Sequence, residues 1–369
     1  MADRERLAER GEESDSARWI LLSSFYERAY SLLYPMNKIR LAILGTGGMA
    51  AEHVERFMKN PDVAIVALGD VSTTVMERFK TDTGLDAVEP VPEMFTDAAT
   101  MFAEAELDAV IIITPHTLHF DHAMLAADAG LHVFMEKPMV TSSDQAHALA
   151  KRFSDLDKVF IVGYNTPCRP EFDFLRTTIR NQSLGKLELI SGYLSQNWMK
   201  LTEGTWRQQP ELSGGGQAYD SGAHLLNSLC WSVESDIAEV FTFLDNRGTP
   251  VDINSSINLR FTNGVMASVV VSGNCATDGA DLHFMFEHGR IDIDGWEGKW
   301  IKVWQADERV ENPSLSGEPQ TPNDNFIDAI LGRAEPRTSI QNGIVQSELM
   351  DAIYESAKTG LPAKPTAKG

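Results

Sequence analysis

The chain has 369 residues, which suggests two domains at roughly 150 residues each, and 43% of the residues are hydrophobic, enough for a core in both. Thirty-two Lys and Arg stand against 53 Asp and Glu, a formal net charge of -21. A surface of that sign repels phosphate backbones and anionic lipids, so we expect no nucleic-acid partner and no membrane.

The cysteines and the hydropathy pattern favour a cytoplasmic location. Cys168, Cys230 and Cys275 show no CxxC spacing and cannot form a disulfide framework. The longest apolar run, residues 109–113, has the length of a buried strand and falls far short of the ~18 residues that span a bilayer.

Residues 1–35 differ from the rest of the chain. A charged stretch up to Asp15 precedes a segment with apolar residues at helical spacing, which predicts an amphipathic helix. Acidic residues replace the basic start of a secretory signal, and Glu27 and Arg28 interrupt the apolar part. Because the sequence from Met36 reads like an ordinary start, this extension is either a docking helix or an over-extended start, and we assign it no function.

Residues 36–165 alternate short apolar strands with longer helical periods, as a parallel sheet with crossover helices requires. The expected strands are 39–44, 63–68, 109–114, 132–136 and 159–163, and the expected helices are 49–59, 73–80, 98–105, 119–129 and 142–153. We therefore predict an N-terminal Rossmann domain of the α/β class, with a doubly wound parallel sheet.

Residues 166–369 have a different pattern, with longer strands of alternating polarity and turns at TNG, HG and DG. The expected strands lie in 187–199, 238–246, 253–273 and 282–295, and helical spacing returns in 325–332 and 345–360. This predicts an α+β domain with a large, mostly antiparallel open sheet flanked by helices, and last helices that pack back toward the first domain.

A glycine-rich turn follows the first expected strand and opens a helix, which is the setting of a dinucleotide-binding loop. Gly45 permits a tight turn, Gly47 lets the backbone approach a pyrophosphate, and Ala50 allows close helix packing. Gly48 and Met49 complete the loop. The alternative is a structural glycine turn without a ligand.

Asp70 ends the next expected strand, where a carboxylate can accept hydrogen bonds from an adenosine ribose. Val71, Ser72 and Thr73 bring no cation behind it that would bind a 2′-phosphate. NAD is therefore favoured over NADP as the cofactor, although Asp70 could also be a simple cap.

Three further motifs follow in order, and together they resemble the Gfo/Idh/MocA family of nicotinamide-dependent sugar and cyclitol oxidoreductases. The motifs are a TPxxxH segment with Thr114, Pro115 and His119, an EKP segment with Glu136, Lys137 and Pro138, and DSGAHLL with Asp220, Gly222 and His224. The resemblance covers about residues 38–362.

The resemblance implies that Lys137 lies beside the nicotinamide and the substrate hydroxyl. There an ammonium group orients the alcohol and stabilises negative charge that develops on its oxygen. The alternative for Lys137 is a solvated surface lysine.

Asp220 and His224 are one helical turn apart and point to the same side if a helix begins there. The resemblance makes His224 the general acid/base, because an imidazole can take the alcohol proton and return it. Asp220 then orients the imidazole, contacts the sugar or shares the proton path. Without the neighbouring motifs, a capping aspartate and a packed histidine would explain this pair.

The cofactor is expected to contact Thr114, Pro115, His119 and Glu136 as well as Lys137. His116 departs from the asparagine that is common in the family, and it either stacks near the cofactor or fills a loop.

Substrate contacts are expected from two segments besides the catalytic set. Tyr164 and Asn165 lie at the domain junction, and Arg169 follows them where relatives carry basic residues. Trp206 and Arg207 precede the GGG loop, where an aromatic face suits a sugar ring, although tryptophans near a sheet edge are also often core or interface residues. No basic anchor for a phosphate group is evident, which favours an unphosphorylated substrate.

Neither a metal site nor a nucleophile motif is indicated by the residue spacing. Relatives associate through the C-terminal sheet, so we expect a homodimer or homotetramer. The apolar strand residues Val269, Val271, Leu282, Phe284 and Phe286 are candidates for that interface, unless the apolar face is used within the chain.

The leading hypothesis is an NAD-dependent dehydrogenase that acts on a secondary alcohol of a sugar, a sugar derivative or an inositol-like cyclitol. An NAD-dependent glycosidase that works through transient oxidation needs the same residues. A non-catalytic sugar- and cofactor-sensing regulator has no need of Lys137 and His224 together.

Overall fold

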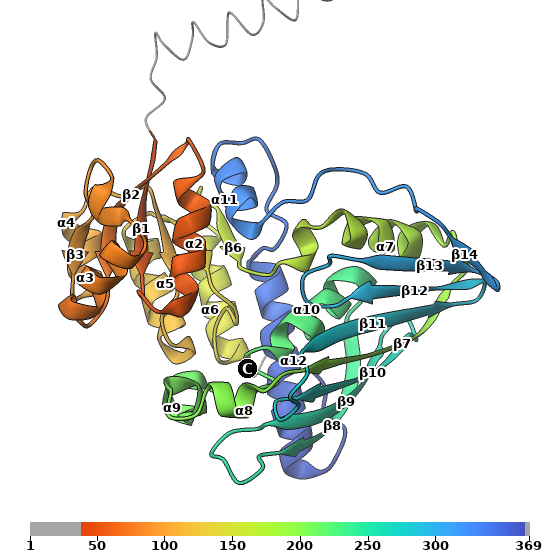
Figure 1. Cartoon of the computed structure of the whole chain (residues 1–369). Coiled ribbons are helices and arrows are strands. Elements are labelled where there is room, and N and C mark those ends of the chain that lie inside the picture. The colour runs from red at the N-terminus through yellow and green to blue at the C-terminus, as the bar shows by residue number, and fades with distance from the viewer. Residues whose placement is uncertain (1–37, 366–369) are drawn as a thin grey trace, which may run out of the picture. The chain divides into compact units, whose positions relative to one another are not determined.

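The structure is a computed structural model that describes residues 38–365 (Figure 1). The predicted helix in residues 1–35 lies outside the described residues. From Arg40 onward the described chain forms one unit by its internal contacts, so the domain boundary at 165/166 stays a prediction.

A six-stranded parallel sheet occupies the first half of the described chain. Its order is β3-β2-β1-β4-β5-β6, so the direction of winding reverses between β1 and β4. The five expected strands are confirmed, and β3 is additional because three residues carry no periodicity. The strands are β1 (Ile39–Leu44), β2 (Val63–Gly69), β3 (Glu93–Phe95), β4 (Ala109–Ile112), β5 (His132–Met135) and β6 (Phe160–Val162).

The crossover helices of this half begin at capping residues that the sequence supplies. Ser72, Asp97 and Ser142 each accept a hydrogen bond from a backbone N–H in the first turn of α3, α4 and α6. The helices are α2 (Gly48–Met58), α3 (Thr73–Asp82), α4 (Ala98–Glu104), α5 (His119–Asp128) and α6 (Ser143–Phe153). Both ends of each helix lie within two residues of the expected ends.

An eight-stranded sheet forms the second half, in the order β14-β13-β12-β11-β7-β10-β9-β8. Only β7 and β10 pair in parallel, so the mostly antiparallel sheet is confirmed. The first expected strand ends early, at Ser195, because a short helix follows it. The strands are β7 (Leu187–Ser195), β8 (Ile237–Asp245), β9 (Asn254–Phe261), β10 (Met266–Ser272), β11 (Gly279–Phe286), β12 (Gly289–Asp294), β13 (Ile301–Gln305) and β14 (Glu308–Val310).

One face of this sheet is covered by helices and holds the core of the second half. α7 (Pro170–Asn181) and α10 (Gly222–Val233) contribute buried residues to the same cluster as the strands. The five residues that we assigned to a subunit interface are at most 7% exposed and lie in this core. That assignment is wrong, because the more apolar row of each strand packs under the helices.

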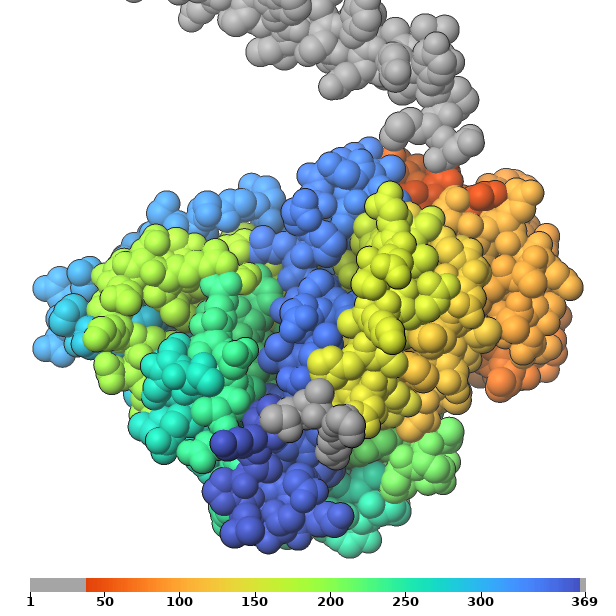
Figure 2. All heavy atoms as spheres, turned by 180° about the vertical axis from the view of Figure 1, so that it is seen from behind, coloured from red at the N-terminus to blue at the C-terminus, as the bar shows by residue number. Residues whose placement is uncertain are grey.

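The helix α12 (Ile340–Thr359) connects the two halves. It packs against α6 and β6 of the first half and against β8 and α10 of the second. Figure 2 shows it between the yellow surface that contains α6 and the green surface of the second half. The helix α11 (Pro322–Ile330) also contacts the first half, at α2 and β6.

No helix within residues 38–365 is long and apolar enough to cross a membrane.

Candidate active site

The carboxyl ends of β1, β4 and β5 border a cavity of about 320 Å³. This is the edge of an open parallel sheet where ligands bind, at the point where the strand order reverses. The cavity is lined by the glycine loop, by the predicted segments after β4 and β5, and by two residues of the second half. The lining residues are Gly47, Gly48, Met49, Glu52, Ile113, Thr114, His116, His119, Glu136, Lys137, Trp206 and Arg207.

The glycine loop has the conformation that a phosphate-binding turn needs. Gly45 has a φ of +96°, and a Cβ atom there would lie 2.6 Å from the carbonyl oxygen of Ile113. At Gly47 and Gly48 no atom lies within 4 Å of an added Cβ, so this backbone is open to a ligand at the N-terminus of α2. Ala50 is fully buried, as close helix packing requires.

The side chain of Asp70 is tied to the glycine loop. Its Oδ2 accepts hydrogen bonds from the backbone N–H and the hydroxyl of Thr46, at 3.0 and 2.9 Å. Its Oδ1 accepts one from the N–H of Ser72 at 3.2 Å. The carboxylate is therefore fixed beside the loop, and the loop and Asp70 together fit a dinucleotide.

Lys137 and Asp220 form the ion pair at the centre of the site. The Nζ of Lys137 lies 2.7 Å from Oδ1 of Asp220, and the two side chains are 12% and 6% exposed. The Oδ2 atom accepts hydrogen bonds from Trp198 Nε1 at 2.8 Å and Arg207 Nε at 3.0 Å. Burial acts to raise the pKa of Asp220, but the charges of Lys137 and Arg207 outweigh it, and the pKa lies well below its usual range.

Glu136 turns its side chain away from this pair. Its Oε1 accepts a hydrogen bond from Nε2 of His53 at 2.9 Å, and its Oε2 accepts one from the N–H of Lys137 at 3.0 Å. Burial raises the pKa of Glu136, while the bond to His53 and the charges of His53 and Lys137 lower it, to about 2 in total. Asn323 holds the other ring nitrogen of His53, so the EKP segment is fixed by two residues that the sequence did not single out.

His224 is held by aromatic rings. Helix α10 begins at Gly222, two residues after Asp220, so His224 lies in its first turn. The imidazole lies 4.7 Å from the ring of Trp296 and 6.0 Å from that of Tyr164, and no hydrogen bond joins its ring nitrogens to another described residue. Burial, aided by the charge of Lys137, lowers the pKa of His224 to about 3, so the ring is neutral at physiological pH.

The GGG loop before Asp220 is clamped by a buried carboxylate that was not predicted. Asp252 accepts hydrogen bonds from the N–H groups of Gly216 and Ala218, at 2.8 and 2.9 Å, and from the hydroxyl of Tyr354. A Cβ at Gly216 would lie 1.9 Å from the carbonyl oxygen of Asp252, so only glycine fits. The spacing of Asp252 and Tyr354 in the sequence gives no signal for this contact.

His116 and His119 are both buried beside the EKP segment. Nδ1 of His116 lies 3.0 Å from the carbonyl oxygen of Ser213, and its Nε2 lies 3.9 Å from Oδ1 of Asp220. The two ring nitrogens of His119 lie 2.8 and 2.9 Å from the carbonyl oxygens of Pro138 and Thr114. His119 thus begins α5 and fastens two loops together, as its expected place at a helix start suggests.

A short arm, residues 197–214, crosses from the second half to the first. Thr117 donates hydrogen bonds to the carbonyl oxygens of Glu211 and Leu212. The arm brings Trp206 to 4.8 Å from the ring of His116 and places the guanidinium of Arg207 over the ring of Trp206. Its elements are α8 (Trp198–Leu201), the 3-10 turn η4 (Trp206–Gln208) and α9 (Pro210–Ser213).

Five expected substrate residues lie outside the lining of this cavity, namely Asp220 and His224, described above, and Tyr164, Asn165 and Arg169. Tyr164 is 1% exposed, its hydroxyl has no hydrogen-bond partner within the described chain, and burial raises its pKa far above the usual range. Asn165 precedes the turn η3 (Thr166–Cys168), and the side chain of Arg169 lies beside Glu171 and Gly298. Their roles stay predictions.

Residues 38–365 contain no group of three or more His, Cys, Asp or Glu that could hold a metal ion.

Two family models match most of the described chain. Residues 39–164 match the model described as an oxidoreductase family with an NAD-binding Rossmann fold, GFO_IDH_MocA, and residues 172–299 match the GFO/IDH/MocA C-terminal domain.

Individual relatives are similar over most of their length. D-glucoside 3-dehydrogenase of Escherichia coli is 25% identical over 88% of this chain and 97% of its own. A scyllo-inositol 2-dehydrogenase (NADP(+)) of Bacillus subtilis is 26% identical over 79% and 86%. The structure of a levoglucosan dehydrogenase in complex with NADH and L-sorbose superposes with a TM-score of 0.76 at 20% identity, over 89% of this chain and 99% of that one, which shows a common fold.

Proposed function

Because this chain belongs to the Gfo/Idh/MocA family of oxidoreductases, we propose that it transfers a hydride between NAD and a secondary alcohol or ketone of an unphosphorylated sugar or inositol-like cyclitol. One observation carries the proposal. The Lys137–Asp220 pair, at 2.7 Å, lies at the same cavity as the open backbone of the glycine loop. A cation that can stabilise an alkoxide thus lies where a dinucleotide would end.

The residues beside the glycine loop favour NAD over NADP. The carboxylate of Asp70 is fixed by Thr46 and Ser72, and a 2′-phosphate would meet its negative charge. A ribose hydroxyl would instead donate a hydrogen bond to it. Gly47, Gly48 and the first turn of α2 would hold the pyrophosphate.

Bound NAD would supply the hydride acceptor for the carbinol carbon, and the protein supplies position and charge. In the proposed oxidation Lys137 donates a hydrogen bond to the substrate oxygen and stabilises its growing negative charge. Asp220 holds the ammonium group in place, and Trp198 and Arg207 hold Asp220. Because Asp220 stays ionised, it keeps Lys137 oriented across the physiological pH range.

His224 receives the hydroxyl proton in this scheme and returns it during reduction. The ring is unprotonated before reaction, and Trp296 and Tyr164 fix its plane. No described residue occupies its nitrogens with a hydrogen bond, so a substrate hydroxyl meets a free lone pair. One proton and one hydride leave the alcohol, and a ketone remains.

The test is formation of reduced nicotinamide by the purified protein, with NAD and with NADP, across neutral sugars, cyclitols, sugar acids and aryl glycosides. We expect turnover with NAD on one class of neutral polyol. Glycoside cleavage that requires NAD without net reduction would replace the dehydrogenase by a glycosidase. Tight cofactor binding without any turnover would instead indicate a sensor.

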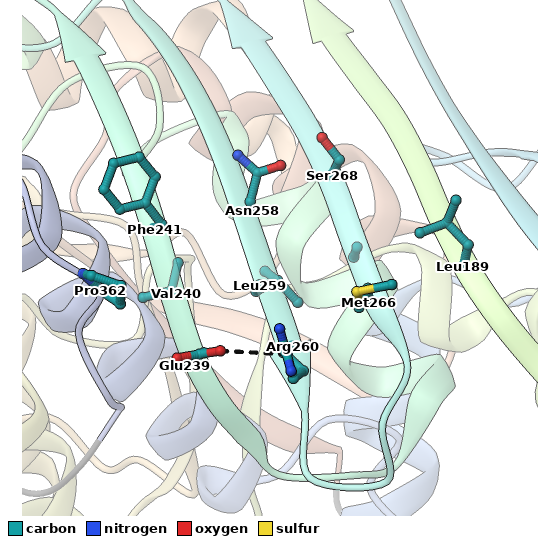
Figure 3. Close-up of a pocket in the computed structure, with 11 residues that line it drawn as sticks. Leu189, Glu239, Val240, Phe241, Asn258, Leu259, Arg260, Met266, Ser268 and Pro362 are labelled. Atoms are coloured by element: carbon teal, nitrogen blue, oxygen red, sulfur yellow. Dashed lines mark ion pairs between the residues drawn. The ribbon is translucent and has the colours of Figure 1, made fainter.

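We also propose that the outer face of the second sheet forms a homodimer or homotetramer interface. Figure 3 shows a hollow on this face, about 310 Å³ in volume, where Leu189 and Met266 lie beside an ion pair of Glu239 with Arg260 at 3.3 Å. Exposed apolar side chains continue along the face, namely Leu189, Tyr193, Phe243, Met266 and Val270. An apolar patch of this kind on a sheet marks an association surface.

Light scattering after size exclusion tests this interface. Met266→Lys combined with Val270→Lys should shift the protein toward a monomer. Met58→Lys, at an exposed position on α2, is the matched control and should leave the mass unchanged. An unchanged mass in the double variant, or a monomeric wild type, would overturn the interface.

A further inference from the structure

The ring of His116 has a fixed tautomer. Its Nδ1 lies 3.0 Å from the carbonyl oxygen of Ser213, which can only accept a hydrogen bond. Nδ1 therefore carries the proton. Burial lowers the pKa of His116 to about 3, so the ring is neutral at physiological pH and its Nε2 offers a lone pair.

His116 lines the cavity of the candidate site, and its Nε2 lies beside the central ion pair. Nε2 lies 3.9 Å from Oδ1 of Asp220, which is itself an acceptor, and no described residue donates a hydrogen bond to Nε2. A buried acceptor without a donor has lost its hydrogen bond to water, and a hydrogen bond from a ligand would remove that cost at Nε2. Lys137 already gives its short hydrogen bond to Oδ1 of Asp220.

We propose that Nε2 of His116 accepts a hydrogen bond from a second hydroxyl of the substrate, adjacent to the hydroxyl that reacts at Lys137. This proposal rests on the proposed function and assigns to His116 the recognition of the hydroxyl next to the reacting one. The reacting oxygen binds Lys137, and the neighbouring hydroxyl of a vicinal diol lies within reach of a lone pair beside Asp220. His116 is thus a specificity-determining residue. A site built to accept a hydrogen bond discriminates strongly against a substrate that lacks the donor.

Two variants distinguish the roles of the two ring nitrogens of His116. In His116→Asn the amide reaches the position of Nδ1 and can still donate to Ser213, while the Nε2 acceptor is lost. In His116→Gln the longer side chain places its amide near the position of Nε2 and restores an acceptor. Thr117→Val removes the hydrogen bonds to Glu211 and Leu212 from the same arm and leaves His116 intact.

Kinetics with matched substrates test the diol preference. The pairs are D-glucose with its 2-deoxy and 3-deoxy derivatives, D-xylose with 2-deoxy-D-xylose, and myo-inositol with a deoxyinositol. In wild type we expect loss of the hydroxyl beside the reacting carbon to lower kcat/KM by about tenfold to a hundredfold, which corresponds to about 1.4 to 2.7 kcal/mol. In His116→Asn the parent and deoxy substrates should become nearly equal, and His116→Gln should regain part of the difference. An equal deoxy penalty in wild type and His116→Asn overturns the proposal, as does a penalty that Thr117→Val abolishes.

A spectroscopic experiment does not depend on turnover, so it can distinguish failure of the proposed function from failure of this proposal. The ¹⁵N chemical shift of His116 Nε2, assigned by its loss in His116→Asn, is followed with NADH alone, each parent polyol alone and both together. We expect a hydrogen-bonded shift only when a polyol is present. A full shift with NADH alone would make the cofactor the donor, and a shift that is already complete without ligand and lost in Lys137→Ala would make Lys137 the donor. Either result, or no shift with any of the polyols, overturns the proposal.

Discussion

The two sides of the candidate site are built by different forces, although Asp220 and His224 are only one helical turn apart. On the carboxylate side, Asp220 receives Lys137, Trp198 and Arg207, and every contact is a charge or a hydrogen bond. On the imidazole side, His224 is held by the rings of Trp296 and Tyr164 and keeps its nitrogens free. In the proposed mechanism, the group that stays charged is fixed by hydrogen bonds and ion pairs, and the group that exchanges a proton is fixed by the packing of aromatic rings.

The largest effect is expected on the carboxylate side. Lys137→Ala removes the cation at the substrate oxygen and should lower kcat about a thousandfold or more, because preorganised charge at a developing oxyanion contributes several kcal/mol. NAD affinity, measured by titration calorimetry, should change little, since the glycine loop and Asp70 are intact.

Lys59→Ala is the control for that variant, because this lysine is exposed on the same half of the chain. Equal loss of turnover and NAD affinity in Lys137→Ala, or loss of neither, would contradict the role of Lys137.

The imidazole side should respond next. His224→Asn removes the proton acceptor and should lower kcat for oxidation by about a hundredfold to a thousandfold, within the range of general-base catalysis. A solvent isotope effect on kcat in wild type that disappears in the variant would support proton transfer to His224. A variant with undiminished kcat would exclude it.

His116 and His224 predict how stability depends on pH, because burial lowers the pKa of both. Their unfolded pKa is about 6.5, and the folded pKa of His116 and of His224 is about 3. Between these values the unfolded chain binds protons that the folded chain does not, so stability falls as the pH drops from 6.5 toward 3, by up to about 1.4 kcal/mol per pH unit for each histidine. Thermal unfolding at pH 7 and pH 5 should show this decrease, and His116→Asn should make it smaller. A Tm equal at the two values would contradict the prediction.

The smallest effect concerns the ring behind His224. Trp296→Leu removes the stacked indole and should lower kcat/KM by about threefold to tenfold, as expected for one aromatic pair. Because water would then reach the imidazole, its pKa should rise toward the usual value, and the acid limb of the kcat/KM profile should move to higher pH. Trp300→Leu, at the end of the same loop between β12 and β13, is the matched control. An unmoved profile in Trp296→Leu would mean that the indole does not shield the imidazole.

Local patterns in the sequence predicted much of the fold and the cofactor loop. The strands β1, β2, β4 and β5 are continuous apolar runs with polar residues after them, so the strand ends that carry Asp70, Thr114 and Lys137 follow from hydropathy. The resemblance to a family placed Lys137 and Asp220 in one site, but it left the contacts of Asp220 open, and the ion pair joins residues that are 83 positions apart.

The supporting contacts could not be predicted in this way. His53 and Asn323 lie 270 positions apart, and Asp252 meets Tyr354 across 102 positions, so no local periodicity reports either contact. The wrong assignment of buried strand residues to a subunit interface has a related cause. Alternation shows that a strand has two faces, but only the placement of the helices decides that Leu282 and Phe284 face the core while Met266 and Val270 face outward.

The helix α12 also constrains how the protein can move. It packs on both halves of the described chain, against α6 and β6 on one side and against β8 and α10 on the other. A hinge motion that separates the two sheets would therefore have to break one of these sets of contacts. The arm of residues 197–214, by contrast, is joined to the first half by only a few hydrogen bonds, which His116 and Thr117 form with the end of the arm. We therefore expect ligands to enter and leave by displacement of this arm, with the two sheets moving as one body.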